Sequence, residues 1–271
     1  MMEFLSYGFI QRALLTGFLL GATCAVLGVF VVLRRMAFIG VGISHAALGG
    51  VAIGLVLGFP PLAAAALFSV LVAWVIGWIT RKGEVSEDTA IGVFFPTAMA
   101  LGVALISLNP QTYRQDLLGY LFGNILSVGT TDLWGLLALS GLSLGVLTLL
   151  FKEFLFLGAD EEAAKAAGLP TGLLNYLLLS IMAITIVAAM KLVGIVLVSA
   201  FLVIPAATGQ ALARSVRGMV LISIGSALLS VGAGLWLSYL WTLPSGASVV
   251  LFSAALFFVS YLLGNLRKAG Q

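Results

Sequence analysis

His45 is the only histidine of this 271-residue chain, and it lies inside a long apolar run. It follows the basic pair Arg34-Arg35 by ten residues, which is about 15 Å along a helix that rises 1.5 Å per residue. An imidazole at that depth is a candidate functional site, because ionisable groups inside an apolar layer are rare and costly. The alternative is a neutral histidine that hydrogen-bonds a neighbouring helix. The residue types alone leave both interpretations open.

The acidic residues do not accompany His45 into the apolar runs. Proton-coupled pumps usually carry an acid within the membrane, so that class is disfavoured. None of the five lysines follows a glycine, so the phosphate-binding loop of an ATPase is missing and any ATP must be bound by another chain. The ten carboxylates all fall at run ends or in loops: Glu3, Glu84, Glu87, Asp88, Asp116, Asp132, Glu153, Asp160, Glu161 and Glu162.

The runs that position these residues are long enough to cross a lipid bilayer. Hydrophobic residues make up 62% of the chain and charged residues 8%, whereas a soluble domain carries about 25% charged residues. A bilayer core of about 30 Å needs roughly 20 apolar residues per helix. We expect an all-α, multi-pass membrane domain over 1–271. Its nine candidate spans are 10–33, 37–58, 62–80, 89–108, 131–151, 172–190, 193–213, 219–240 and 247–265.

Two features set the count and the orientation of these spans. The junction at Lys191-Leu192 is too short for an ordinary hairpin, so eight spans with one kinked segment are the alternative to nine. Most basic residues gather on one side, which predicts an outer N-terminus and a cytoplasmic C-terminus. This placement accounts for the net charge of +3 without a nucleic acid partner. The predicted inner residues are Arg34, Arg35, Arg81, Lys82, Lys152, Lys165, Arg214, Arg217, Arg267 and Lys268, and the outer ones are Arg12, Arg114 and Lys191.

Small residues recur at every fourth position beside His45. Such a stripe lets another helix approach closely, and its other possible use is as the wall of a narrow pathway. With Ser44, the neighbour of His45, these residues are candidates for packing or for the pathway. The stripe comprises Gly42, Ala46, Gly50, Gly54 and Gly58.

Two short segments lie between spans. Residues 116–127 are apolar but too short to cross, and we expect a short outer-face or re-entrant helix there. On the inner side, residues 158–170 form the longest polar loop. Acidic residues load the first turn of the helix expected there, and Gly168-Leu-Pro stops it. A partner protein could bind this segment; the alternative is a solvated connector.

The inner loop is also where the chain becomes similar to a known family. Glu162-Ala-Ala-Lys-Ala-Ala-Gly168 resembles the loop by which importer permeases dock on their ATPase subunits. Further stretches resemble the permeases of metal-ion ABC importers for zinc, manganese and iron, which are of the type II importer class, and they follow in family order. They are Leu33-Arg-Arg-Met-Ala-Phe-Ile-Gly40 with Ser44-His45-Ala46, Ser86-Glu-Asp-Thr-Ala-Ile-Gly92, Tyr120-Leu-Phe-Gly-Asn124, Leu192 to Pro205-Ala-Ala, and Pro244-Ser-Gly-Ala247.

The resemblance implies an assembly rather than a single chain. The partners are a second copy of this chain, two ATP-binding subunits on the inner face and an extracellular or periplasmic metal-binding protein. The resemblance also implies that the chain lies in the cytoplasmic membrane of a bacterium or archaeon. We expect that the chain is not an enzyme and that it holds no resident cofactor. The residues implied in coupling to the ATPase are Asp160, Glu161, Glu162, Ala163, Ala164 and Gly168.

The resemblance also assigns a role to His45. Members of the family often carry Asp-x-x-x-His at the start of the second span, where the pair is thought to coordinate the passing ion. Here His45 matches the histidine, but Val41 occupies the position of the acid. Imidazole suits zinc better than manganese, which prefers oxygen ligands. We therefore expect a divalent metal as transported substrate, with zinc favoured over manganese and iron.

Two other functions are consistent with parts of the sequence. One is an importer permease for a chelated or organic metal substrate, of the siderophore or cobalamin kind, although such permeases are usually longer. The other is a channel or ion-driven carrier that acts alone.

The free Cys24, inside an apolar run, is expected to be a packing residue.

Overall fold

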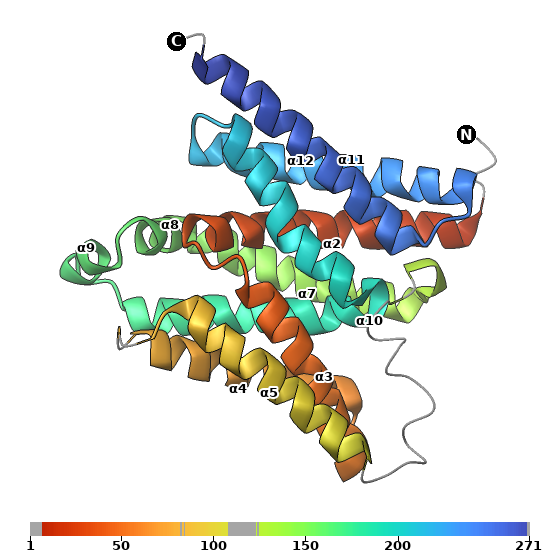
Figure 1. Ribbon diagram of the computed structural model, residues 1–271, viewed down its shortest axis with the longest axis horizontal. Helices are drawn as coiled ribbons and strands as arrows, with labels where there is room; N and C mark the ends of the chain where they lie inside the picture. The colour runs from red at the N-terminus through yellow and green to blue at the C-terminus, as the bar shows by residue number, and fades with distance from the viewer. Residues whose placement is uncertain (1–6, 82, 84, 108–122, 124, 270–271) are drawn as a thin grey trace.

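The computed structural model describes residues 7–81, 83, 85–107, 123 and 125–269, and the side chains of these up to residue 264. That part of the chain is helical, and its long helices lie side by side in one bundle (Figure 1). The elements are α2 (Gly8–Leu33), α3 (Ile39–Leu57), α4 (Pro61–Arg81), α5 (Glu87–Ser107), η2 (Ile125–Ser127), α7 (Thr130–Leu149), α8 (Phe151–Ala159), α9 (Glu161–Ala166), α10 (Thr171–Leu212), α11 (Val216–Trp241) and α12 (Ser245–Ala269).

Eight of these helices are long and apolar enough to cross a membrane. Seven correspond one to one to expected spans, and α10 combines two of them. At 42 residues, a straight α10 would be about 63 Å long, twice the thickness of a bilayer core. Gly194 interrupts it with φ 82° and ψ 159°, a conformation that is essentially restricted to glycine. The break divides α10 into a first arm, 171–193, and a second arm, 195–212.

The two arms run in opposite directions between the two ends of the bundle (Figure 1). Asn175, near the start of the first arm, bonds to Arg34 at the end of α2. Lys191, next to the break, pairs with Asp132 at the start of α7. The second arm then returns, since a side chain at Gly28 of α2 would collide with the carbonyl of Leu202. With α10 counted as two arms, the described residues therefore contain nine segments that run between the two ends.

An odd number of crossings agrees with the positions of the chain ends. The start of α2 and the end of α12 lie at opposite ends of the bundle, as the predicted orientation requires (Figure 1). We call the end that contains Arg34 and α9 the Arg34 end, and the end that contains Asp132 and Lys191 the Asp132 end. By the distribution of basic residues, the Arg34 end is the predicted cytoplasmic side.

The helices fall into an inner and an outer group. The apolar windows of α2, α3 and α10 are 72%, 72% and 78% buried, whereas those of α4, α5, α7 and α12 are 33% buried or less. Apolar side chains that face outward from the outer group belong in contact with lipid or with another subunit, because exposing so large an apolar surface to water is unfavourable. The candidate site residues on α3 are thus held by the most enclosed part of the fold.

Two expected short segments differ from the structure. Of residues 116–127, only 123 and 125–127 are described; Ile125–Ser127 forms a single 3-10 turn, and the rest of the expected helix lies outside the described residues. The inner-face helix was expected over 158–170 but is shorter: Gly158 and Ala159 belong to α8, and α9 covers Glu161–Ala166 alone. Helix α8 was not expected, because the charges of Lys152 and Glu153, directly after its first residue, indicate the end of a span.

Candidate functional site

His45 lies on α3, two turns from its start, and its ring is half-buried against α5. The rings of His45 and Phe95 form an edge-to-face contact, with their centroids 4.6 Å apart and their planes at 78°. Its Nδ1 lies 2.9 Å from the carbonyl oxygen of Val41, one turn earlier. Because a carbonyl can only accept, the neutral ring carries its proton on Nδ1. The lone pair of Nε2 is then available for a metal ion, the arrangement usual for histidine ligands.

A pair of hydroxyl groups lies beside His45. The Ser44 hydroxyl donates to the Val41 carbonyl at 2.9 Å, and its oxygen lies 3.2 Å from that of Ser199 on the second arm of α10. Ser44 is fully buried and Ser199 half-buried. Ser199 was not singled out from the sequence, because serines are common in membrane helices. The contact joins the helix that carries His45 to α10.

The small-residue stripe on α3 serves close packing. A side chain at Gly50 would lie 2.6 Å from Cα of Ala65 on α4, and one at Gly42 would lie 2.8 Å from Ile91 on α5. Gly54 approaches Pro61 in the same way, and Ala46 is fully buried. These contacts account for the small residues within α3, whereas Gly58 ends the helix at φ 73° and a Cβ there would meet nothing within 4 Å. A role of the stripe as a pathway wall stays a prediction.

The acidic residues of the inner loop have three different environments. The Asp160 carboxylate accepts a hydrogen bond of 2.9 Å from the Ala163 N–H and caps α9. Glu161 points back to the bundle, where its two oxygens lie 4.0 Å from Arg34 and 3.5 Å from Arg81. Glu162 is exposed and has no ion pair within the described residues. Of the three, Glu162 alone neither caps a helix nor pairs with an arginine within the described residues.

The rest of the loop has the expected helix signals. Ala163 is half-buried and Ala164 fully buried, so this side of α9 faces the bundle. Gly168 adopts φ 83°, and the chain turns there through backbone bonds from Gly168 to Lys165 and from Leu169 to Ala164. Left-handed glycine is the usual end of a helix. The predicted acidic start and glycine stop of this helix are therefore confirmed.

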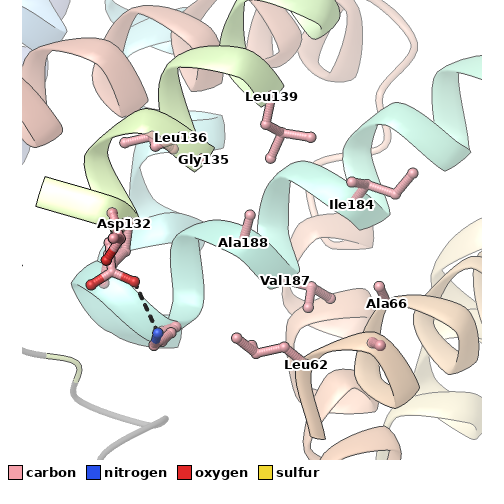
Figure 2. Close-up of a pocket in the computed structure, with 13 residues that line it drawn as sticks. Leu62, Ala66, Asp132, Gly135, Leu136, Leu139, Ile184, Val187 and Ala188 are labelled. Atoms are coloured by element: carbon pink, nitrogen blue, oxygen red, sulfur yellow. Dashed lines mark hydrogen bonds and ion pairs between the residues drawn. The ribbon is translucent and has the colours of Figure 1, made fainter. Parts of the chain in front are cut away.

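A cavity of about 440 Å³ opens at the Asp132 end, between α4, α7 and α10. Figure 2 shows leucine, isoleucine, valine and alanine side chains around it, with the Lys191–Asp132 ion pair of 2.9 Å at its rim. The carboxylate is already paired, and the other lining residues supply no metal-binding side chain. Within the described residues, no three histidine, cysteine or acidic side chains gather into a metal centre.

The sequence matches one known family over nearly its whole length. The model of the ABC 3 transport family matches residues 6–264. The chain belongs to the ABC 3 transport family. It is the permease subunit of a metal ABC importer, a multi-pass protein of a bacterial membrane, and is not itself an enzyme; ATP is hydrolysed on a separate subunit.

Three relatives of this ABC 3 permease cover nearly its whole length. The Manganese transport system membrane protein MntC of Listeria innocua is 37% identical over 95% of this chain and 91% of its own. The Manganese import system permease protein ScaB of Streptococcus gordonii is 36% identical over 97% and 94%. The solved structure of PsaBC from Streptococcus pneumoniae in complex with Fab superposes with a TM-score of 0.84 at 34% identity, covering 96% of this chain and 95% of the other.

Proposed function

We propose that this permease imports a divalent transition-metal ion, with manganese as the first candidate substrate. The observation that carries the proposal is similarity over the full length to two permeases named for manganese, at 37% and 36% identity. Metal would pass along a pathway between two copies of the chain, which alternates between outward-open and inward-open states. Partner ATPase subunits at the Arg34 end would drive the change, and a separate metal-binding protein would deliver the ion at the other end.

Zinc is the second candidate, and the local chemistry of the site favours it. His45 offers a nitrogen ligand, and Val41 stands where the resemblance leads us to expect an acid. Nitrogen ligands suit zinc, whereas manganese prefers carboxylate, carbonyl and water oxygens. With Nδ1 bonded to the Val41 carbonyl, each subunit would contribute one Nε2 to the passing ion. Weak coordination of this kind suits transport, because the ion must be released.

Uptake by the reconstituted complex tests the proposal. The permease, its ATPase and its binding protein would be placed in vesicles, and ATP-dependent uptake of Mn²⁺, Zn²⁺ and Fe²⁺ measured separately. We expect uptake of Mn²⁺ to exceed that of the other two. Preference for Zn²⁺ would replace manganese by zinc, and absence of uptake of all three would refute metal import.

Two variants of His45 separate a ligand from a packing residue. His45→Asn keeps an N–H donor in reach of the Val41 carbonyl but has no atom at the position of Nε2, whereas His45→Ala removes both. We expect both variants to lose uptake by about tenfold or more, the effect of losing one ligand interaction of about 1.4 kcal/mol. Normal uptake by His45→Asn would assign His45 to packing.

Val41→Asp supplies an oxygen ligand one turn away and should shift preference towards Mn²⁺.

A further inference from the structure

A cluster of charged and polar side chains ties α9 to the membrane helices at the Arg34 end. Arg34 follows α2 directly, and its side chain is 9% exposed. One guanidinium nitrogen donates to Oδ1 of Asn175 at 2.6 Å, and the other lies 4.0 Å from Glu161. The second oxygen of Glu161 lies 3.5 Å from Arg81, the last residue of α4. The cluster therefore joins α9 to the ends of α2 and α4 and to the start of α10.

The position of Arg34 makes its partners necessary. Burial lowers the pKa of the Arg34 guanidinium, and the charges of Glu87 and Glu161 act in the opposite direction. A buried charge is tolerated only when it is paired and hydrogen-bonded. The planar guanidinium serves two elements at once, which a lysine ammonium could not do with the same geometry. Arg34 is thus a fixed point for both Asn175 and Glu161.

Helix α9, by contrast, has little else to hold it. It spans six residues, and Ala164 is its one fully buried residue. A helix of that length is not stable alone, because nucleation costs more than so few hydrogen bonds return. The ion pairs of Glu161 therefore add to the burial of Ala164 in attaching α9 to the bundle.

The connection from Arg34 to the candidate metal ligand is short and stiff. Backbone bonds from Arg35 to Val32 and from Met36 to Val31 close the end of α2, with Arg35 at φ 59°. This is the geometry of a Schellman motif. Helix α3 begins at Ile39 and carries His45. A displacement of Arg34 is therefore passed to α3 without a flexible loop between them.

We propose that Arg34, Arg81 and Glu161 are positioning residues that convert movement of α9 into movement of the helices around His45. In this assignment Glu161 is an inward anchor rather than a contact for the ATPase, and Glu162 is the residue presented outward. The inference rests on the proposed function, since it assumes that ATPase movement reaches the permease through α9. It requires a contiguous physical connection, which the cluster supplies.

The attachment of α9 is measured first, without transport. A spin label at Lys165→Cys, an exposed position, reports the mobility of α9 in the reconstituted complex, in a Cys24→Ala background. We expect Glu161→Gln to shorten the rotational correlation time of the label by about twofold or more, because it removes the charge of a partly buried pair. Asp88→Asn is the matched control, because it neutralises an exposed carboxylate at the start of α5, and it should leave the label unchanged. Equal mobility in the two variants overturns the inference.

Coupling is measured next, as metal ions transported per ATP hydrolysed. We expect Glu161→Gln and Arg81→Gln each to lower this ratio by about threefold or more, the size of an ion pair worth under 1 kcal/mol, while ATPase activity and assembly persist. Arg217→Gln, at an exposed arginine of the same end, should keep the wild-type ratio. An unchanged ratio in Glu161→Gln overturns the inference. A wild-type complex that hydrolyses ATP without moving metal refutes the proposed function instead, and the label still decides whether Glu161 holds α9.

Discussion

The two ends of the bundle are stabilised in different ways. At the Arg34 end, a guanidinium that is 9% exposed connects an amide, a carboxylate and three helix termini. At the Asp132 end, the Lys191–Asp132 pair is shorter, at 2.9 Å, but its side chains are 46% and 30% exposed. Distance alone therefore does not rank the two pairs. The difference lies in Arg34 alone, because Glu161, at 39% exposed, is as open to solvent as Lys191 and Asp132, and an exposed pair gains little over its separate hydrated charges.

The Asp132 end depends on backbone conformation instead. Gly194 reverses α10 at a positive φ, and Gly123, at φ 58°, approaches the Gly194 nitrogen so closely that no side chain fits between them. One end of the permease is thus fixed by glycine geometry and the other by buried charge. Charged side chains can change partners during a transport cycle, whereas a glycine turn stays as it is. This difference is consistent with ATPase-driven movement entering at the Arg34 end.

Arg34→Met tests the buried charge at the Arg34 end, and we expect it to lower stability more than the other substitutions compared below. Methionine keeps the apolar length of the side chain but leaves Asn175, which is 3% exposed, without its donor. Leaving a buried amide oxygen without its charged donor costs up to about 3 kcal/mol. We expect a clear fall in the thermal unfolding midpoint of the detergent-solubilised protein. Arg217→Met, at an exposed position of the same end, should unfold like the wild type. If both variants unfold at the same temperature, Arg34 does not stabilise this end of the bundle.

Gly194→Ala tests the backbone side, with a somewhat smaller effect. Alanine at φ 82° and ψ 159° costs about 2 kcal/mol, because its Cβ meets the backbone in this region. The Gly123 backbone leaves no room for relief. Gly225→Ala on α11 is the control, since a Cβ there meets nothing within 4 Å and alanine favours the helix. Fluorescence-detected size-exclusion chromatography after heating compares them. Equal survival would show that the turn does not require glycine.

The sequence predicted most of the fold, because each crossing is an uninterrupted apolar run. It left the reversal within α10 open and put the junction at Lys191-Leu192, whereas the structure turns at Gly194. A lysine is visible in a hydropathy pattern, but a positive φ is not. Helix α8 was missed because Lys152 and Glu153 interrupt the hydropathy pattern, although the backbone is helical through them.

The candidate site was predicted in part. His45 was singled out because it is unique in the chain, and its role as a metal ligand stays a prediction; the start and stop of α9 were predicted from Asp160 and Gly168. The roles of Arg34, Glu161 and Asn175 were not found, because Arg34 and Asn175 lie 141 positions apart. Three-dimensional proximity over such separations leaves no local pattern. An amide inside an apolar run, as at Asn175, was the available signal that a buried polar partner must exist.

The Lys191–Asp132 pair gives the smallest expected effect and so measures the contrast between the ends. Both side chains reach the surface at the rim of the cavity (Figure 2), and exposed pairs contribute at most about 1 kcal/mol. A double-mutant cycle with Lys191→Met and Asp132→Asn, followed by unfolding in detergent, isolates the interaction from the effects of each substitution. We expect a coupling energy below about 1 kcal/mol that weakens further in high salt. A coupling as large as the loss in Arg34→Met would show that both ends rely on charge, and that burial does not separate them.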